Sequence, residues 1–179
     1  MRISEVVEGL LQKHNLSRAP IPVERLAQIL GVELRYEPFS GKEDQVSGML
    51  FRDAGRTVIG INANEGLLRQ RFTIAHEIGH LLLHKDQMYL DTPAEVFMRN
   101  QRSSQSIDPK EIQANTFAAE LLMPEKMLRT EATDVQAELS KRSPLVDTEE
   151  LVERLAQKFQ VSIQAMTFRL ANLGIVKLA

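Results

Sequence analysis

The apolar positions at the start of the chain follow the three-to-four-residue spacing of a helix. They are Ile3, Val6, Val7, Leu10 and Leu11. This spacing predicts an amphipathic helix that buries one face. Pro20 and Pro22 interrupt the pattern, and a second helix is predicted over residues 23–30, with Gly31 at the position of a C-terminal cap.

Three short stretches after this helix have the composition of β-strands. They are Val32–Tyr36, Val46–Phe51 and Thr57–Ile61. The last two flank Asp53-Ala54-Gly55, which predicts a hairpin turn. Because no helical pattern separates the three stretches, we expect a small three-stranded antiparallel sheet rather than a parallel one.

From about residue 65 to residue 84 the pattern becomes helical and so broadly apolar that a buried helix is predicted. Residues 86–107 are polar and irregular, which predicts a long loop of the kind that usually carries function. Another helix is predicted over residues 108–123, with Pro109 in its first turn. The expected fold class is therefore α+β, mostly helical with a small sheet.

The last forty residues contain two predicted helices, over residues 149–159 and 163–172. Val161-Ser162 would form the tight turn between them, so this segment resembles a helix-turn-helix. We therefore expect two parts, a domain over residues 1–139 and a helix-turn-helix-like segment over residues 140–179.

The composition is that of an ordinary globular protein, with 43% hydrophobic and 26% charged residues and a formal net charge of −2. This charge gives no global attraction to nucleic acid or to an anionic membrane. The apolar runs are far shorter than a membrane span, and the first residues form no apolar signal segment, so we expect a cytoplasmic protein without a membrane partner. The chain has no cysteine, so nitrogen and oxygen ligands must hold any bound metal.

The residues that carry chemistry are His76-Glu77-Ile78-Gly79-His80, inside the predicted buried helix. Positions i and i+4 of a helix share a face, so the two imidazoles can hold one divalent ion. Glu77 projects beside that ion, where its carboxylate can take a proton from a bound water. Burying two histidines and a glutamate without a purpose would cost several kcal/mol, which favours a metal site.

Catalytic zinc usually has three protein ligands and a water, so one ligand is still to be assigned. The candidates are His84, Asp86, Glu95 and Glu111. His84 follows His76 by two helical turns, about 12 Å along the axis, so it is expected beside the ion rather than on it. Asp86 has the spacing of the third ligand in metzincin-like sites, but Leu83 stands where those sites need a glycine. For Glu95, in the predicted loop, no spacing or neighbouring residue indicates a role as ligand.

Glu111 is favoured because it begins the next predicted helix, as the third ligand does in glutamate-type zincins. Asn115 lies one turn later on the same face and could hydrogen-bond a ligating histidine from behind. The alternative is that Glu111 only completes a capping box with Asp108.

Two stretches carry a family resemblance: RQRFTIAHEIGHLLLH at residues 69–84 and EIQANTFAAELLMP at residues 111–124. With these, and with weaker likeness at Val46–Leu50, Ile61-Asn62 and Phe159–Ile175, the chain resembles the ImmA/IrrE family of metallo-endopeptidases. The second stretch is the more specific, because H-E-x-x-H occurs in many unrelated peptidases. Gln113 departs from the pattern, since many relatives carry another acidic residue there, and this removes a rival ligand.

The resemblance implies a zincin-like domain with a gluzincin-like site. In that site His76, His80 and Glu111 bind one zinc ion with a bound water, and Glu77 is the general base. The resemblance also implies a protein substrate, a helix-turn-helix transcriptional repressor of a mobile element or stress regulon, which the enzyme would cleave.

A different class of function stays open, a non-catalytic metal-containing transcription regulator or an antitoxin-like binding protein. Its last helix would offer Gln164, Thr167 and Arg169 to a DNA groove. Few basic residues remain for phosphates, so direct DNA binding is not favoured. Hydrolysis of a small amide is a third alternative. The oxyanion-stabilising group is left open among Tyr89, Arg99, Arg102 and His84.

Overall fold

The structure is a computed structural model that describes residues 2–39, 46–53, 55–84, 89–91, 108–141 and 147–177. It divides into two compact units: residues 22–118, which we call the sheet unit, and residues 1–21 with 119–179, which we call the helical unit. The predicted boundary at residue 140 stays a prediction. Among the described helices, none combines the length and the hydropathy needed to cross a bilayer.

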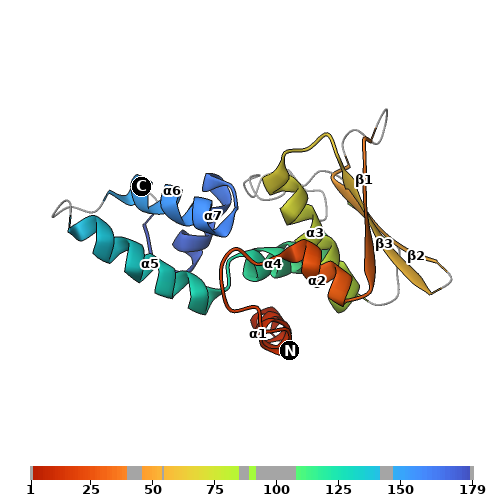
Figure 1. The fold of residues 1–179 in the computed structure, drawn as a ribbon, viewed down its shortest axis with the longest axis horizontal. Helices are drawn as coiled ribbons and strands as arrows, with labels where there is room; N and C mark the ends of the chain where they lie inside the picture. The colour runs from red at the N-terminus through yellow and green to blue at the C-terminus, as the bar shows by residue number, and fades with distance from the viewer. Residues whose placement is uncertain are drawn as a thin grey trace. The chain divides into compact units, whose positions relative to one another are not determined.

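The sheet unit combines helices with a four-stranded sheet (Figure 1). Its elements are α2 (Val23–Ile29), β1 (Val32–Glu37), β2 (Gly48–Asp53), β3 (Arg56–Asn62), α3 (Leu67–Leu83), β4 (Tyr89–Asp91) and, up to residue 118, α4 (Pro109–Leu122). The strand order is β1-β3-β2-β4. The α+β class and the three predicted strands are confirmed.

The strand directions differ from the prediction in one respect. β2 and β3 pair antiparallel, as the hairpin signal predicts. β1, however, pairs parallel with β3, with Val32 opposite Thr57, so the expectation of a fully antiparallel sheet is wrong for this strand. The reason is the order of the strands in the sheet. β2 does not pair with β1, and the hairpin after β2 places β3 between β1 and β2, where β3 runs in the same direction as β1. β4 is a fourth strand, antiparallel to β2, within a segment predicted as loop.

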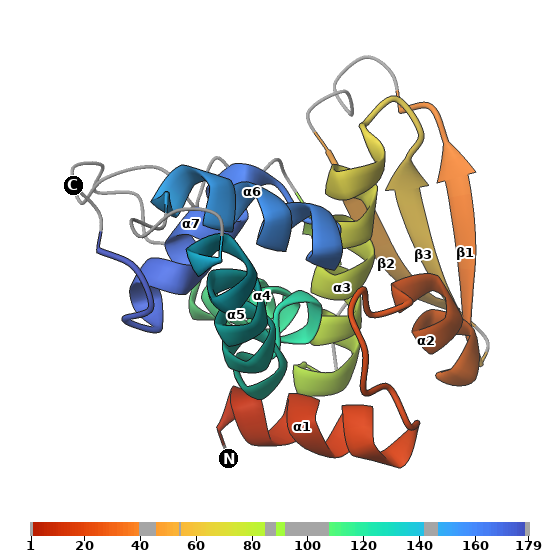
Figure 2. The ribbon, with the colours of Figure 1, turned by 60° about the vertical axis from the view of Figure 1, so that its left-hand side comes forward.

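Helix α3 packs along one face of the sheet (Figures 1 and 2). Leu50 of β2 and Ile59 and Ile61 of β3 are fully buried, as are Ile74 and Ile78 of α3. Ile59 and Ile61 point to the same face because side chains alternate along a strand. Burial of each such side chain contributes about 1.5–3 kcal/mol, so the core of this unit fixes α3 on the sheet.

The helical unit contains α1 (Ile3–Lys13), the end of α4, α5 (Glu125–Ser140), α6 (Thr148–Phe159) and α7 (Ile163–Asn172). The last two helices have the predicted bounds to within one residue. Between them, Gln160 adopts a left-handed conformation with φ of 53°, and the Ser162 hydroxyl caps α7 by accepting from the Ala165 amide. Phe159, Met166 and Leu170 are fully buried, so these helices pack into their own unit.

Arg169, one of the three side chains that the alternative prediction offers to DNA, is held inside the helical unit. Its Nε donates to the carbonyl oxygen of Met123 at 3.1 Å, and its guanidinium pairs with Glu120. Both side chains of this ion pair are only 13% exposed. A guanidinium in this position is already committed to protein partners.

Candidate metal centre

The H-E-x-x-H residues lie in the buried middle of α3. Every residue from Thr73 to His80 is buried, and His76, Glu77 and His80 have no exposed surface. Polar groups of this kind cost several kcal/mol to remove from water unless other groups compensate them. The helix therefore carries these three titratable groups where only an interaction inside the protein can stabilise them.

The two histidines face each other as the helical spacing predicts. Their Nε2 atoms are 2.9 Å apart, and the ring centroids are 4.6 Å apart with the ring planes at 72°. One turn of α3 separates the residues, so the backbone itself holds the two ring nitrogens at a common point.

Glu111 of α4 completes the group. Its Oε2 lies 3.3 Å from the Nε2 of His76, and its Oε1 lies 3.2 Å from the Nε2 of His80. Each of the three residues has one donor atom within 4.8 Å of the others. Asp108 caps α4 by accepting from the Lys110 amide at 2.9 Å, while the carboxylate of Glu111 is directed at the imidazoles.

Asn115 orients His76 from behind. Its Oδ1 lies 2.9 Å from the Nδ1 of His76, and both residues are buried. An amide oxygen only accepts, so His76 Nδ1 carries the proton and donates it to this bond. A neutral ring protonated at Nδ1 has its lone pair on Nε2, the atom that faces His80 and Glu111, and this is the form that binds a metal.

Gly79 allows α4 to approach α3 closely, and this role was missed in the sequence. A Cβ atom at position 79 would lie 3.1 Å from Cδ1 of Phe117 and 3.2 Å from Cα of Ala114. Both neighbours belong to α4, between and beside the turns that carry Glu111 and Asn115. The available signal was a glycine placed between two histidines of a buried helix, where every residue except proline has a higher helix propensity.

The electrostatics of Glu111 favour the ionised carboxylate. Burial alone raises its pKa, but hydrogen bonding to His76 and His80 and the positive charge that these rings carry when protonated outweigh that effect and lower the pKa to about 2. At neutral pH Glu111 is therefore an anion beside two imidazoles, a donor set suited to a cation.

His84, the C-cap of α3, lies beside the group and not within it. Its Nε2 is 3.3 Å from the carbonyl oxygen of Lys110, and its ring centroid is 5.5 Å from that of His80. Burial lowers the pKa of His84, so the ring is neutral at pH 7 and donates from Nε2 to the carbonyl. This bond ties the end of α3 to the residue before Glu111.

The other candidates of the sequence analysis cannot be placed. Asp86, Glu95, Arg99 and Arg102 lie outside the described residues, as does the side chain of Tyr89. The structure thus brings together His76, His80, Glu111, Asn115 and the flanking His84, with Glu77 on the same helix.

Comparison with known proteins decides the family. Residues 27–171 match the family model of a peptidase family described as the IrrE N-terminal-like domain. The chain belongs to the ImmA/IrrE family of metallopeptidases.

Three relatives illustrate the membership in the ImmA/IrrE family. The chain is 33% identical over 130 residues to metallopeptidase ImmA of Bacillus subtilis, covering 73% of this chain and 66% of that protein. It is 37% identical over 123 residues to an uncharacterized immunity region protein of Bacillus phage phi105, covering 69% of each. It is 34% identical over 103 residues to the radiation response metalloprotease IrrE of Deinococcus radiodurans, covering 58% of this chain but 28% of that protein.

A solved structure shares the fold over most of this ImmA/IrrE family chain. It is a Mycobacterium tuberculosis transcriptional regulator, with a TM-score of 0.58 and 14% identity. The match covers 94% of this chain and 46% of that one, so the chain spans about half the length of the regulator. At this identity the likeness concerns the fold alone.

The donor set of this ImmA/IrrE family member fits a divalent metal ion. Two ligands about 2.1 Å from a tetrahedral ion are about 3.4 Å apart. Here the two Nε2 atoms are 2.9 Å apart, and each of them lies 3.2 or 3.3 Å from one of the two carboxylate oxygens of Glu111. The carboxylate also balances part of the charge of a divalent cation, and imidazoles bind such an ion in their neutral form. His76, His80 and Glu111 can therefore hold such an ion together.

Proposed function

We propose that the chain is a zinc-dependent endopeptidase that hydrolyses a peptide bond in a protein substrate. The observation that carries the proposal is the meeting of His76, His80 and Glu111, with donor atoms within 4.8 Å of one another, on the helix that buries Glu77. Structural zinc sites are closed by four protein ligands, whereas catalytic sites keep one position for water. Within the described residues, three protein donors gather here, which supports a catalytic site.

In the proposed reaction His76, His80 and Glu111 hold the ion, and Asn115 keeps His76 protonated at Nδ1. Zinc, when bound, would supply Lewis-acid activation of a water molecule and of the scissile carbonyl. Glu77 would accept a proton from the attacking water at a carboxylate oxygen and pass it to the nitrogen of the breaking C–N bond. The water hydroxyl ends on the carbonyl carbon and its proton on the leaving amine.

His84 has a supporting role in this proposal. Its hydrogen bond to the Lys110 carbonyl holds the first turn of α4, and Glu111 is the next residue. The ring thus helps to keep the carboxylate at the imidazoles of α3, without joining the ligand set.

The substrate that we propose is a helix-turn-helix repressor of a mobile element or stress regulon. Support comes from the family resemblance and from the names of relatives, which include an immunity region protein of a phage and a radiation response metalloprotease. A repressor substrate also fits the expected cytoplasmic location. The helix-turn-helix-like pair α6 and α7 is proposed to pack or to bind protein rather than DNA, because Arg169 is held by Glu120.

The test combines metal analysis with cleavage of the purified helix-turn-helix repressor encoded by the neighbouring gene. Wild type, Glu77→Gln and the matched control Glu153→Gln, at an exposed position of α6, are compared. We expect zinc in all three, cleavage by wild type and control, and a rate about 10²–10⁴-fold lower for Glu77→Gln.

Two outcomes would overturn the proposal. One is a wild-type protein that binds no zinc or leaves the repressor intact. The other is a Glu77→Gln variant with full biological activity while His80→Ala has none, because that pair of results fits a non-catalytic metal-containing regulator or antitoxin-like protein instead.

A further inference from the structure

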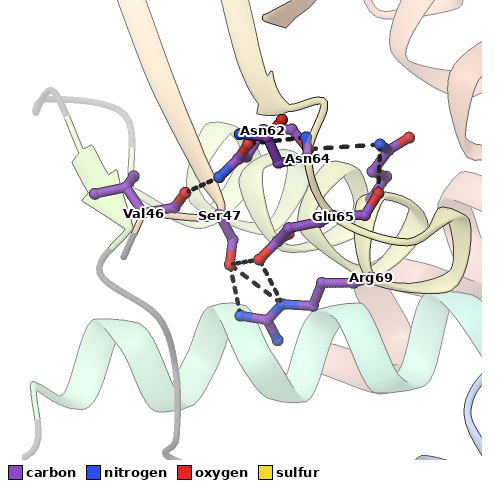
Figure 3. A network of polar contacts seen from close by, with 7 residues as sticks. Val46, Ser47, Asn62, Asn64, Glu65 and Arg69 are labelled. Carbon is purple, nitrogen blue, oxygen red and sulfur yellow. Dashed lines mark hydrogen bonds and ion pairs between the residues drawn. The ribbon is translucent and has the colours of Figure 1, made fainter. Parts of the chain in front are cut away.

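A polar cluster at the start of β2 has no part in holding a metal (Figure 3). The buried hydroxyl of Ser47 donates to Oε1 of Glu65 at 2.8 Å. It accepts from the guanidinium of Arg69, with Nε at 3.2 Å and Nη2 at 2.8 Å. Arg69 and Glu65 also form an ion pair at 3.7 Å. Hydrogen bonds with a charged partner are roughly twice as strong as neutral ones, so this serine is held firmly against the start of α3.

The backbone of Val46 and Ser47 is fixed from the other side by Asn62, the last residue of β3. The Asn62 amide donates to the carbonyl of Ser47 at 3.0 Å, and its Nδ2 donates to the carbonyl of Val46 at 3.1 Å. The Oδ1 of Asn62 accepts from the Asn64 amide at 3.0 Å. In Figure 3 the side chain of Asn62 reaches the carbonyl of Val46, while the hydroxyl of Ser47 meets Glu65 and Arg69. The chain therefore enters β2 at a defined position.

The residue that follows is Gly48, which lies against Thr73 and Glu77 of α3. A Cβ atom at position 48 would lie 2.3 Å from Cγ2 of Thr73, 3.2 Å from the carbonyl oxygen of Gly60 and 3.4 Å from Oε1 of Glu77. The strand backbone thus occupies the space beside the Glu77 carboxylate that a side chain would otherwise fill. Thr73 and Glu77 are one helical turn apart, so both face this strand.

We propose that Ser47 and Gly48, anchored by Glu65 and Arg69, are positioning residues that hold the carboxylate of Glu77 in its place beside the metal centre. The inference rests on the proposed peptidase function. A glutamate has three side-chain torsions, and the wall at Gly48 limits where its carboxylate can lie. A proton acceptor misplaced by 1 Å can lose about 100-fold in rate, so a close wall is a means of positioning the base.

The experiment exploits the methyl group of Thr73. In Gly48→Ala the new methyl collides with Cγ2 of Thr73, and Thr73→Ser removes that carbon while keeping the hydroxyl. We expect Gly48→Ala to lower kcat for repressor cleavage by about 100-fold, with KM and zinc content unchanged. Thr73→Ser alone should stay near wild type, and the double variant should recover most of the lost kcat.

The matched control is Gly60→Ala in the same sheet. A Cβ atom there meets nothing closer than 3.7 Å, at Cζ of Phe39, so activity should not change. Ser47→Ala is a second variant, which removes the anchor without adding bulk. It should lower kcat by about tenfold and leave KM and zinc content as in wild type.

The results separate this inference from the proposed function. Suppose that wild type cleaves and Glu77→Gln does not, but that Gly48→Ala or Ser47→Ala keeps the wild-type kcat. The inference that these residues position Glu77 is then wrong, and the peptidase assignment stands. If Gly48→Ala loses its kcat and Thr73→Ser fails to restore it, the contact with Thr73 does not set the position of Glu77. If Gly48→Ala does not fold, Ser47→Ala decides. A wild type that cleaves nothing removes both proposals.

Discussion

The two units of the chain treat ionisable side chains in opposite ways. In the sheet unit, His76, Glu77 and His80 are fully buried on one helix, and Glu111 is directed at the two imidazoles. In the helical unit most charged pairs lie at or near the surface, as do Lys158 with Glu131 and Arg154 with Glu150, and the mostly buried Arg169 is neutralised by Glu120. Exposed pairs add little to stability and need no special explanation. Buried titratable groups that converge on one point do need an explanation, and this difference places the candidate metal centre in the sheet unit.

The largest difference between the two units is expected when one histidine is removed from each. His80→Ala deletes a proposed ligand, so we expect zinc affinity to fall by more than about 100-fold and cleavage to be lost. His14→Ala, at the end of α1, should leave zinc content and cleavage unchanged. Zinc titration with a fluorescent chelator measures the first effect. Equal zinc affinity in both variants would show that the convergence of rings in α3 is not a metal site.

A smaller effect is expected from the residue behind the ligand. Asn115→Ala removes the acceptor of the His76 Nδ1 proton, so zinc affinity should fall by about 10–100-fold while the fold persists. Asn172→Ala, at an exposed position of α7, is the control. Competition for zinc between each variant and a chelator gives the affinities, and an unchanged affinity for Asn115→Ala would contradict the orienting role.

In the helical unit, removal of a mostly buried charged side chain should lower stability without changing catalysis. Arg169→Met removes the ion pair with Glu120 and the bond to the Met123 carbonyl, both at a mostly buried position. We expect a loss of about 1–3 kcal/mol in the free energy of unfolding, and kcat and zinc content as in wild type. Urea denaturation measures the loss. A defect in cleavage at full folding would instead extend the functional part of the molecule into this unit.

The smallest effect is expected for a surface pair of the helical unit. A double-mutant cycle on Lys158 and Glu131 should give a coupling below about 1 kcal/mol that falls further at high salt, because solvent screens exposed charges. Thermal unfolding of the two single variants and the double variant checks this value. A larger, salt-independent coupling would mean that this pair is more buried than its exposures of 46% and 21% indicate.

Sequence patterns predicted the local elements and the core of the site because both depend on short spacings. The i, i+4 spacing of His76 and His80 follows from one helix, and the hairpin between β2 and β3 follows from its turn residues. Parallel pairing of β1 with β3 was missed, since strand order depends on contacts between distant segments and not on local periodicity.

The same limit applies to the surroundings of the site. Glu111 was favoured among several acidic candidates by resemblance, because no spacing rule connects two helices that are far apart in sequence. The roles of Gly48 and Gly79 depend on the distance between one backbone and its neighbour, which a single sequence does not encode at those positions. Periodicity does not distinguish Gly48 from a glycine such as Gly9, which meets no atom within 4 Å, and for Gly79 it indicates only that the helix is buried.

The way the donors are divided between α3 and α4 has a consequence for how the two helices are held together. Two of the three donors come from α3 and the third from α4, so an ion bound by all three would cross-link the two helices. A ligand that binds only the folded form stabilises that form by about 2.7 kcal/mol when its concentration is 100 times its dissociation constant. A divalent ion at that concentration would therefore strengthen the packing of α4 on α3 in addition to any part it takes in the reaction.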